Sequence, residues 1–138
     1  MTFHVMIIPT LGCPSNCAYC WGSEENAELM DIDVINQIVK WLANFRDEPV
    51  HFTFHGGEPL LAGYEFYEKA LPLLNDATTH ETEGFSLQSN LWLLDEDMAK
   101  GLSALKERKH LIAEQKTTLH SFKLTDLGRE ILDLGFTI

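Results

Sequence analysis

The spacing of apolar residues alternates between strand-like and helix-like along the first hundred residues. Residues 3–10 form a short apolar run, and its length and Val/Ile content favour a strand buried on both faces. A loop rich in turn-forming residues follows over residues 11–23. From Asp31 or Asp33, either of which can cap a helix, apolar residues recur at helical spacing to about Arg46.

A second strand and helix are predicted after this first pair. Residues 50–55 alternate apolar and polar side chains, which is typical of a strand, and Gly56-Gly57-Glu58-Pro59 ends it. A helix is expected over about residues 64–75, with apolar side chains on one face. Pro72 inside this helix predicts a kink or an early stop, because proline lacks the N–H donor and crowds the preceding turn.

A third unit completes the pattern. Residues 85–90 are predicted as a strand and residues 96 to about 108 as a helix capped by Asp95. Strand and helix thus alternate three times, which predicts an α/β fold with a parallel sheet and right-handed crossovers, the N-terminal portion of a partial (β/α) barrel. A short strand over residues 110–115 and a helix over 123–134 are expected to form a tail.

Composition and charge narrow the class of protein. The chain has 138 residues, 45% of them hydrophobic and 22% charged, which fits a globular domain. Its net charge of −11 argues against a general phosphate-attracting surface for nucleic acid. No basic leader and no apolar run of about 18 residues is present in the sequence, so we expect no membrane span and a cytoplasmic location.

The charge is unevenly spread along the chain. Residues 1–99 carry three basic and sixteen acidic side chains, whereas residues 100–138 carry seven basic and five acidic ones. This is the one break in composition, and it favours a segment boundary near Lys100. We therefore divide the chain into residues 1–108, the three strand–helix units, and residues 109–138, a tail of uncertain origin.

All three cysteines, Cys13, Cys17 and Cys20, lie within eight residues of the first loop. An odd number at this spacing does not suit a disulfide scaffold and is typical of a metal site. Three thiolates can bind three corners of a cubane iron–sulfur cluster, leaving one iron open to a reactant. Two alternatives are a zinc site completed by His55 and a redox dithiol of Cys17 and Cys20. Zinc motifs usually have two separated cysteine pairs, and the dithiol leaves Cys13 unexplained.

These residues carry a resemblance to a known family. The spacing Cys13-x-x-x-Cys17-x-x-Cys20 resembles the signature of the radical S-adenosylmethionine superfamily, and Gly56-Gly57-Glu58-Pro59 is similar to its second motif in type and place. The longer run over residues 54–61, and Gln88-Ser89-Asn90, resemble the anaerobic sulfatase-maturase and peptide-modifying (SPASM-type) branch. The resemblance covers residues 3 to about 99.

The resemblance implies cofactors, an activity and partners. Cys13, Cys17 and Cys20 would ligate a [4Fe–4S] cluster, whose open iron would chelate S-adenosylmethionine. Reductive cleavage of S-adenosylmethionine would then release a 5′-deoxyadenosyl radical for modification of a peptide or protein side chain. The implied partners are that substrate and a low-potential electron donor such as flavodoxin or ferredoxin.

The resemblance also implies which residues contact S-adenosylmethionine. The GGE residues would hold the methionyl ammonium, the aromatic residue before the last cysteine would pack beside the adenine, and the third strand's end would contact the ribose or the methionyl carboxylate. Two plainer interpretations stand beside these: Glu58 as a surface carboxylate after a tight turn, and Asn90 as the cap of a turn. The implied contacts are Tyr19, Gly56, Gly57, Glu58, Ser89 and Asn90.

The chain also departs from the family pattern. Members of this branch continue through further strand–helix units, whereas this chain has three clear units and no cysteine after Cys20. One hypothesis is therefore a short or truncated radical enzyme, and the other a non-catalytic remnant or cluster-binding module. An open half-barrel would expose a sheet edge and favour oligomers or aggregation. Residues 122–132 weakly resemble the closing strand and helix of a winged-helix domain.

Overall fold

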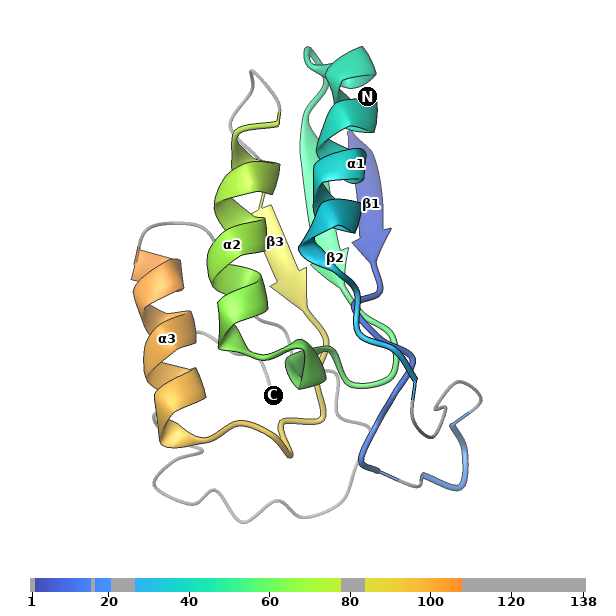
Figure 1. Ribbon diagram of the computed structural model, residues 1–138, viewed down its shortest axis with the longest axis vertical. Helices are drawn as coiled ribbons and strands as arrows, with labels where there is room; N and C mark the ends of the chain where they lie inside the picture. The colour runs from blue at the N-terminus through green and yellow to red at the C-terminus, as the bar shows by residue number, and fades with distance from the viewer. Residues whose placement is uncertain (1, 16, 21–26, 78–83, 108–138) are drawn as a thin grey trace.

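Three strands and three α-helices alternate along the chain (Figure 1). The computed structural model describes residues 2–15, 17–20, 27–77 and 84–107. The α/β fold class predicted from the sequence is confirmed, since the part described here forms three β–α units of a partial (β/α) barrel. The elements are β1 (Phe3–Ile7), α1 (Ile32–Leu42), η1 (Ala43–Phe45), β2 (Val50–Phe54), η2 (Pro59–Ala62), α2 (Tyr64–Asn75), β3 (Gly84–Leu87) and α3 (Glu96–Glu107).

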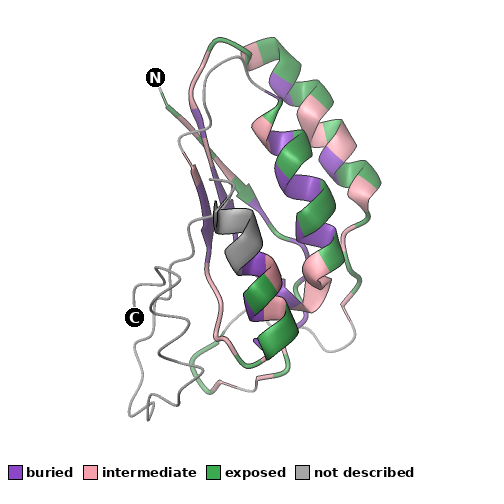
Figure 2. Cartoon of the chain, turned by 90° about the vertical axis from the view of Figure 1, so that its left-hand side faces the viewer, coloured by how far each residue is buried: buried purple, intermediate pink, exposed green. Residues whose placement is uncertain are grey.

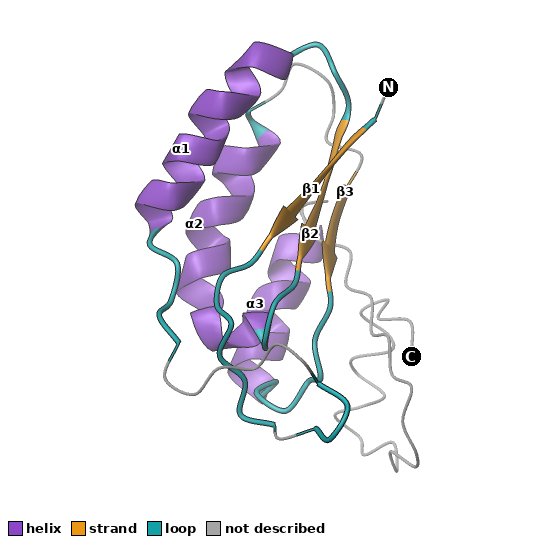
Figure 3. Cartoon of the chain, turned by 90° about the vertical axis from the view of Figure 1, so that its right-hand side faces the viewer, coloured by secondary structure: helices purple, strands orange, loops and turns teal. Residues whose placement is uncertain are grey.

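The strands form one parallel sheet in the order β1-β2-β3. Ile7 at the end of β1 lies opposite Phe54 at the end of β2, which in turn lies opposite Leu87 at the end of β3. Because the strands are parallel and in this register, their carboxyl ends meet at one edge of the sheet. The loops that follow them therefore begin side by side (Figure 3).

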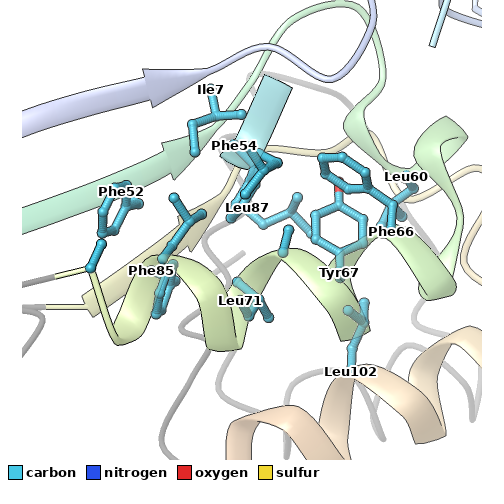
Figure 4. Close-up of a cluster of buried hydrophobic side chains, with 14 of the residues drawn as sticks. Ile7, Phe52, Phe54, Leu60, Phe66, Tyr67, Leu71, Phe85, Leu87 and Leu102 are labelled. Carbon is cyan, nitrogen blue, oxygen red and sulfur yellow. The ribbon is translucent and has the colours of Figure 1, made fainter. Parts of the chain in front are cut away.

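The core lies between the sheet and the helices, which cover the same face of the sheet (Figures 2 and 3). Phe54 of β2 packs its ring against Tyr67 of α2, with ring centroids 5.2 Å apart, and against Phe66 at 6.4 Å. Phe52 stacks on Phe85 of β3 at 5.3 Å. Figure 4 shows this cluster of aromatic and aliphatic side chains between strands and helices. It anchors the carboxyl end of the sheet, where the loops emerge.

The expectation that the first strand is buried on both faces is wrong. Ile7 is buried on the helix side, but His4 and Met6 alternate with it and are exposed, Met6 to 57%. Within the described residues the helices cover only one face, so the run is buried only on alternate positions. On the face opposite the helices, His4 Nε2 lies 2.6 Å from Thr53 Oγ1, and Thr53 is itself buried.

The helix expected over about residues 64–75 is confirmed, and of the kink or early stop expected at Pro72, the early stop is wrong. α2 continues through Pro72 to Asn75, and Asp76 donates its backbone N–H to the Pro72 carbonyl at 3.0 Å. Proline removes only one donor, late in the helix. Leu71 and Leu74, both fully buried, hold this last turn against the core. Tertiary packing thus outweighs the local preference of one residue.

The helix caps predicted from the sequence are confirmed. Asp31 accepts a bond from Asp33 N at 2.9 Å at the start of α1, and Asp95 accepts one from Met98 N at 2.7 Å at the start of α3. The strand, helix and winged-helix ending expected after residue 109 lie outside the described residues. Among the helices that are described, none combines the length and apolar character needed to cross a bilayer.

Candidate functional site

Three loops leave the carboxyl ends of the three strands and meet at one edge of the sheet (Figure 3). We call them the cysteine loop (residues 8–15 and 17–20), the GGEP turn (residues 56–59) and the β3 loop (residues 88–92). Every residue predicted from the sequence to bind metal or S-adenosylmethionine lies on one of these loops. The parallel topology therefore gathers residues that are up to 77 positions apart in sequence.

Backbone bonds join the GGEP turn to the cysteine loop. His55 N donates to the Ile7 carbonyl at 2.9 Å, Gly57 N to the Thr10 carbonyl at 3.0 Å, and Glu58 N to the Gly12 carbonyl at 2.8 Å. These bonds continue the pairing of β1 and β2 past the ends of the two strands. The first residues of the cysteine loop are thereby held at the sheet edge.

The two glycines of the turn allow this close approach. Gly56 has φ +122°, and a Cβ there would lie 2.5 Å from the Thr10 carbonyl oxygen. A Cβ on Gly57 would lie 2.2 Å from the Gly12 carbonyl oxygen and 2.4 Å from that of Leu11. Both contacts are with backbone atoms, which cannot move aside as a flexible side chain can. The geometry therefore requires glycine at both positions.

Glu58 is buried beneath the loops, with only 1% of its surface exposed. Its Oε1 accepts from Leu60 N at 3.0 Å and from Ser89 Oγ at 2.7 Å, and its Oε2 accepts from Asn90 N at 2.8 Å. The alternative of a surface carboxylate is wrong. Three hydrogen bonds to the charged group offset the cost of removing it from water.

Tyr67 supports the turn from the core. Its hydroxyl donates to the Pro59 carbonyl at 2.6 Å. Burial, and then the nearby charge of Glu58, raises the pKa of this hydroxyl well above its usual value, so it remains a proton donor. The sequence does not predict this bond, because nothing in helical spacing indicates a partner eight positions earlier.

Asn90 connects the β3 loop to the cysteine loop. Its Nδ2 donates to Ser15 Oγ at 2.9 Å and to Cys13 Sγ at 3.6 Å. Its Oδ1 accepts from Trp92 N at 3.0 Å, so it also caps a turn, as the plainer interpretation expected. Asn90 thus has both a local and a long-range role. Ser15 was not predicted from the sequence, since a serine in a turn carries no specific signal.

The three cysteines lie on one loop, and none of them forms a disulfide. Cys13 and Cys17 are partly buried and Cys20 is exposed. Cys20 N donates to the Cys17 carbonyl at 3.0 Å, which closes a turn around Tyr19. The Tyr19 ring is 61% exposed, yet the pKa of its hydroxyl is raised, first by partial desolvation and then by its hydrogen bond to Cys17 and the charges of Cys17 and Cys20.

The donor set suits an iron–sulfur cluster in its chemistry. Three thiols free of disulfides on one loop are the ligands that such clusters take from proteins. In the part of the chain described here, no three His, Cys, Asp or Glu side chains form a ready-made metal group. The zinc site completed by His55 is therefore not preformed either. His55 Nδ1 accepts from Gly56 N at 2.6 Å. The loop therefore supplies donors that a bound group would still have to draw together.

Comparison with known proteins identifies the family. The model of the radical SAM superfamily matches residues 7–112. The chain belongs to the radical SAM superfamily. An uncharacterised relative from Methanothermobacter thermautotrophicus is 51% identical over 100 residues, covering 72% of this chain and 38% of that protein. The cysteine-type anaerobic sulfatase-maturating enzyme of Clostridium perfringens is 32% identical over 123 residues, covering 83% of this chain and 33% of the enzyme.

Solved structures of anSMEcpe share the fold. Native anSMEcpe with bound AdoMet and Kp18Cys peptide matches with a TM-score of 0.75 and 26% identity, over 97% of this chain and 40% of that one. A histidine-tagged form of anSMEcpe with bound AdoMet matches with a TM-score of 0.71 and 30% identity, over 85% and 32%. This radical SAM chain thus spans only about a third of the length of the curated relatives it matches.

Proposed function

We propose that Cys13, Cys17 and Cys20 ligate a [4Fe–4S] cluster and that the adjoining loops bind S-adenosylmethionine for its reductive cleavage. The observation that carries this proposal is the meeting of the three loops. Asn90 of the β3 loop donates to Cys13 Sγ, and the GGEP turn is bonded along its backbone to the cysteine loop. Membership of the radical SAM superfamily supports S-adenosylmethionine-dependent radical chemistry.

Each loop contributes a different part of the binding. A cluster held by Cys13, Cys17 and Cys20 would, when reduced, supply one electron for the cleavage of S-adenosylmethionine to methionine and a 5′-deoxyadenosyl radical. Gly56 and Gly57, held close to the cysteine loop, would offer backbone carbonyls to the methionyl ammonium. Tyr19, whose ring is exposed, provides a surface for the adenine.

Glu58 and Ser89 have few hydrogen-bonding positions left for a ligand. A carboxylate has about four lone-pair sites, and Glu58 already uses three of them for its own chain's donors. It can therefore offer about one further contact to an ammonium group. Ser89 Oγ donates to Glu58 and accepts from Leu91 N, so its contact with the ribose or carboxylate of the ligand would be secondary.

We further propose a peptide or protein side chain as the substrate and a low-potential flavodoxin or ferredoxin as the electron donor. The support is similarity: relatives are sulfatase-maturating enzymes, and two solved neighbours hold AdoMet together with a peptide. Both partners are proposals for this chain, since it covers about a third of those enzymes.

Anaerobic reconstitution tests the proposal in two steps. The full chain, supplied with iron and sulfide, should take up about four irons, and a chain with all three cysteines changed to alanine should take up none specifically. Dithionite and S-adenosylmethionine should then yield 5′-deoxyadenosine, measured by chromatography. Zinc in place of iron would overturn cluster binding. A fully loaded chain that forms no 5′-deoxyadenosine would overturn cleavage and leave a cluster-binding module.

A further inference from the structure

The environment of Glu58 points to a role within the protein itself. The side chain is 1% exposed, and its two oxygens accept from Leu60 N, Ser89 Oγ and Asn90 N at 2.7 to 3.0 Å. Two of these donors belong to the β3 loop, more than 30 positions further along the chain. The carboxylate therefore fastens the β3 loop to the GGEP turn.

The β3 loop needs such a fastening. Leu91 has φ +64°, a left-handed conformation that costs free energy for a residue with a side chain. Its N–H is held by Ser89 Oγ, the same hydroxyl that donates to Glu58. The unfavourable backbone conformation of Leu91 is therefore held by a chain of hydrogen bonds that runs through Ser89 Oγ to the Glu58 carboxylate.

Asn90 carries this constraint to the cysteine loop. Its N–H is fixed by Glu58 Oε2, while its side chain donates to Ser15 Oγ and Cys13 Sγ. A path of hydrogen bonds thus runs from Glu58 through Asn90 to the first cysteine. A hydrogen bond to a ligating sulfur stabilises the reduced state of an iron–sulfur cluster. The Asn90 bond to Cys13 would therefore affect the reduction potential of a bound cluster as well as its position.

We propose that Glu58 and Asn90 are positioning residues for the cysteine loop: the Glu58 carboxylate locks the β3 loop, and the Asn90 amide locks Cys13. This role is distinct from direct contact between Glu58 and the methionyl ammonium. The fastening of the loops is a property of the chain without its cofactors. Only the effect on the cluster rests on the proposed function.

Amide hydrogen exchange of the full chain without cofactors tests the fastening. Glu58→Gln keeps the shape but replaces one accepting oxygen by a donor, so exchange over residues 88–92 and in the cysteine loop should rise about tenfold or more. Glu68→Gln, at an exposed position of α2, is the matched control and should change nothing there. Exchange in Glu58→Gln equal to that in Glu68→Gln would overturn the proposal.

Milder variants keep this test usable if Glu58→Gln fails to fold. Ser89→Ala removes one donor to Oε1 and the acceptor of Leu91 N but leaves the Asn90 N bond to Oε2, so exchange should rise at Leu91 and less than in Glu58→Gln at Asn90. Asn90→Ala keeps the carboxylate bonds but removes the link to Cys13, so exchange should rise in the cysteine loop and at the Gly57 and Glu58 amides bonded to it, and not at Leu60 N, which the Glu58 carboxylate still holds. Unchanged exchange in both variants would refute the path.

The reduction potential of the reconstituted chain tests the effect on the cluster. Asn90→Ala should make reduction less favourable by about tenfold, equivalent to about 59 mV for one electron, followed by EPR. Glu58→Gln should shift the potential in the same direction. A change in S-adenosylmethionine affinity alone, with potential and exchange unaltered, would assign Glu58 to the ammonium instead. Failure of the wild-type chain to take up iron would refute the proposed function and leave the exchange result standing.

Discussion

At the scale of single residues, Tyr67 links the core to the candidate site. Its ring packs on Phe54 in the core, and its hydroxyl donates to the Pro59 carbonyl of the GGEP turn. Its pKa is raised above the usual 10.0 by burial and by the charge of Glu58. In the unfolded chain the same hydroxyl ionises near pH 10. Above that pH the unfolded state binds fewer protons than the folded state, so stability falls as pH rises.

Replacing Tyr67 by phenylalanine should therefore change both the stability and its pH dependence. At pH 7 the variant should lose about 1–3 kcal/mol, because the Pro59 carbonyl is left without its buried donor. Between about pH 10 and 11 the wild type should lose stability more steeply than the variant, which lacks the ionising group. Urea unfolding at a series of pH values measures both effects. Parallel pH profiles for the two proteins would contradict the assignment.

The site residues predicted from the sequence lie on three adjoining loops of the structure, but the sequence did not predict their hydrogen-bond partners. The cysteines, the GGEP turn and the Ser-Asn pair were predicted because each follows a strand and matches a motif of fixed local spacing. The partners of Glu58 depend on the register between β2 and β3, across 31 and 32 positions of sequence. Local patterns carry no information on such contacts, so the carboxylate was predicted either to face a ligand or to lie on the surface.

At the scale of elements, strands and helices followed from periodicity and capping residues. Asp31 and Asp95 begin their helices as predicted, because a cap acts on amides two or three positions away. Two expectations were wrong where packing decides: α2 passes Pro72, and β1 is buried on one face only. The end of α2 and the burial of β1 both depend on which neighbouring element covers the residue, and the assembled sheet determines this.

The contact between the cysteine loop and the GGEP turn is also a property of elements, and Gly57 controls it. In Gly57→Ala the new Cβ would lie within 2.4 Å of two carbonyl oxygens of the cysteine loop, so the two loops must separate. We expect the variant to lose about 1–3 kcal/mol of stability and most of its iron uptake on reconstitution. Iron per folded chain and thermal unfolding measure the two effects.

Gly63→Ala is the matched control for this loop contact. Gly63 has φ +79° and nothing within 4 Å of a Cβ, so alanine there adds backbone strain of about 1–3 kcal/mol without touching the cysteine loop. Its stability should fall by a similar amount while iron uptake is retained. Equal iron uptake by the two variants would show that the close approach at Gly57 has no bearing on the cluster site.

At the scale of the whole molecule, the described part is a sheet covered on one face. Its three strands leave β1 at an edge, and the helices lie on one face of the sheet (Figure 2). On the other face His4 Nε2 lies 2.6 Å from Thr53 Oγ1. Exposed apolar side chains gather along β1 and just beyond it: Met6 at 57%, and Ile8 and Leu11 at 41% each. An edge strand with apolar neighbours is a surface on which a second copy can pair.

Self-association through β1 is therefore the property expected of the full chain in solution. Met6→Lys places a charge on the exposed face beside the edge, where it should oppose pairing while the helix side of the core stays intact. Sedimentation velocity over a range of concentrations should show oligomers for the wild type and a shift to monomer for Met6→Lys. Leu73→Lys, at a 37% exposed position of α2 on the other side of the sheet, should associate like the wild type. A wild-type chain that stays monomeric at every concentration would show that β1 is not a self-association edge. Equal loss of association in both variants would show that the change in net charge alone causes the effect.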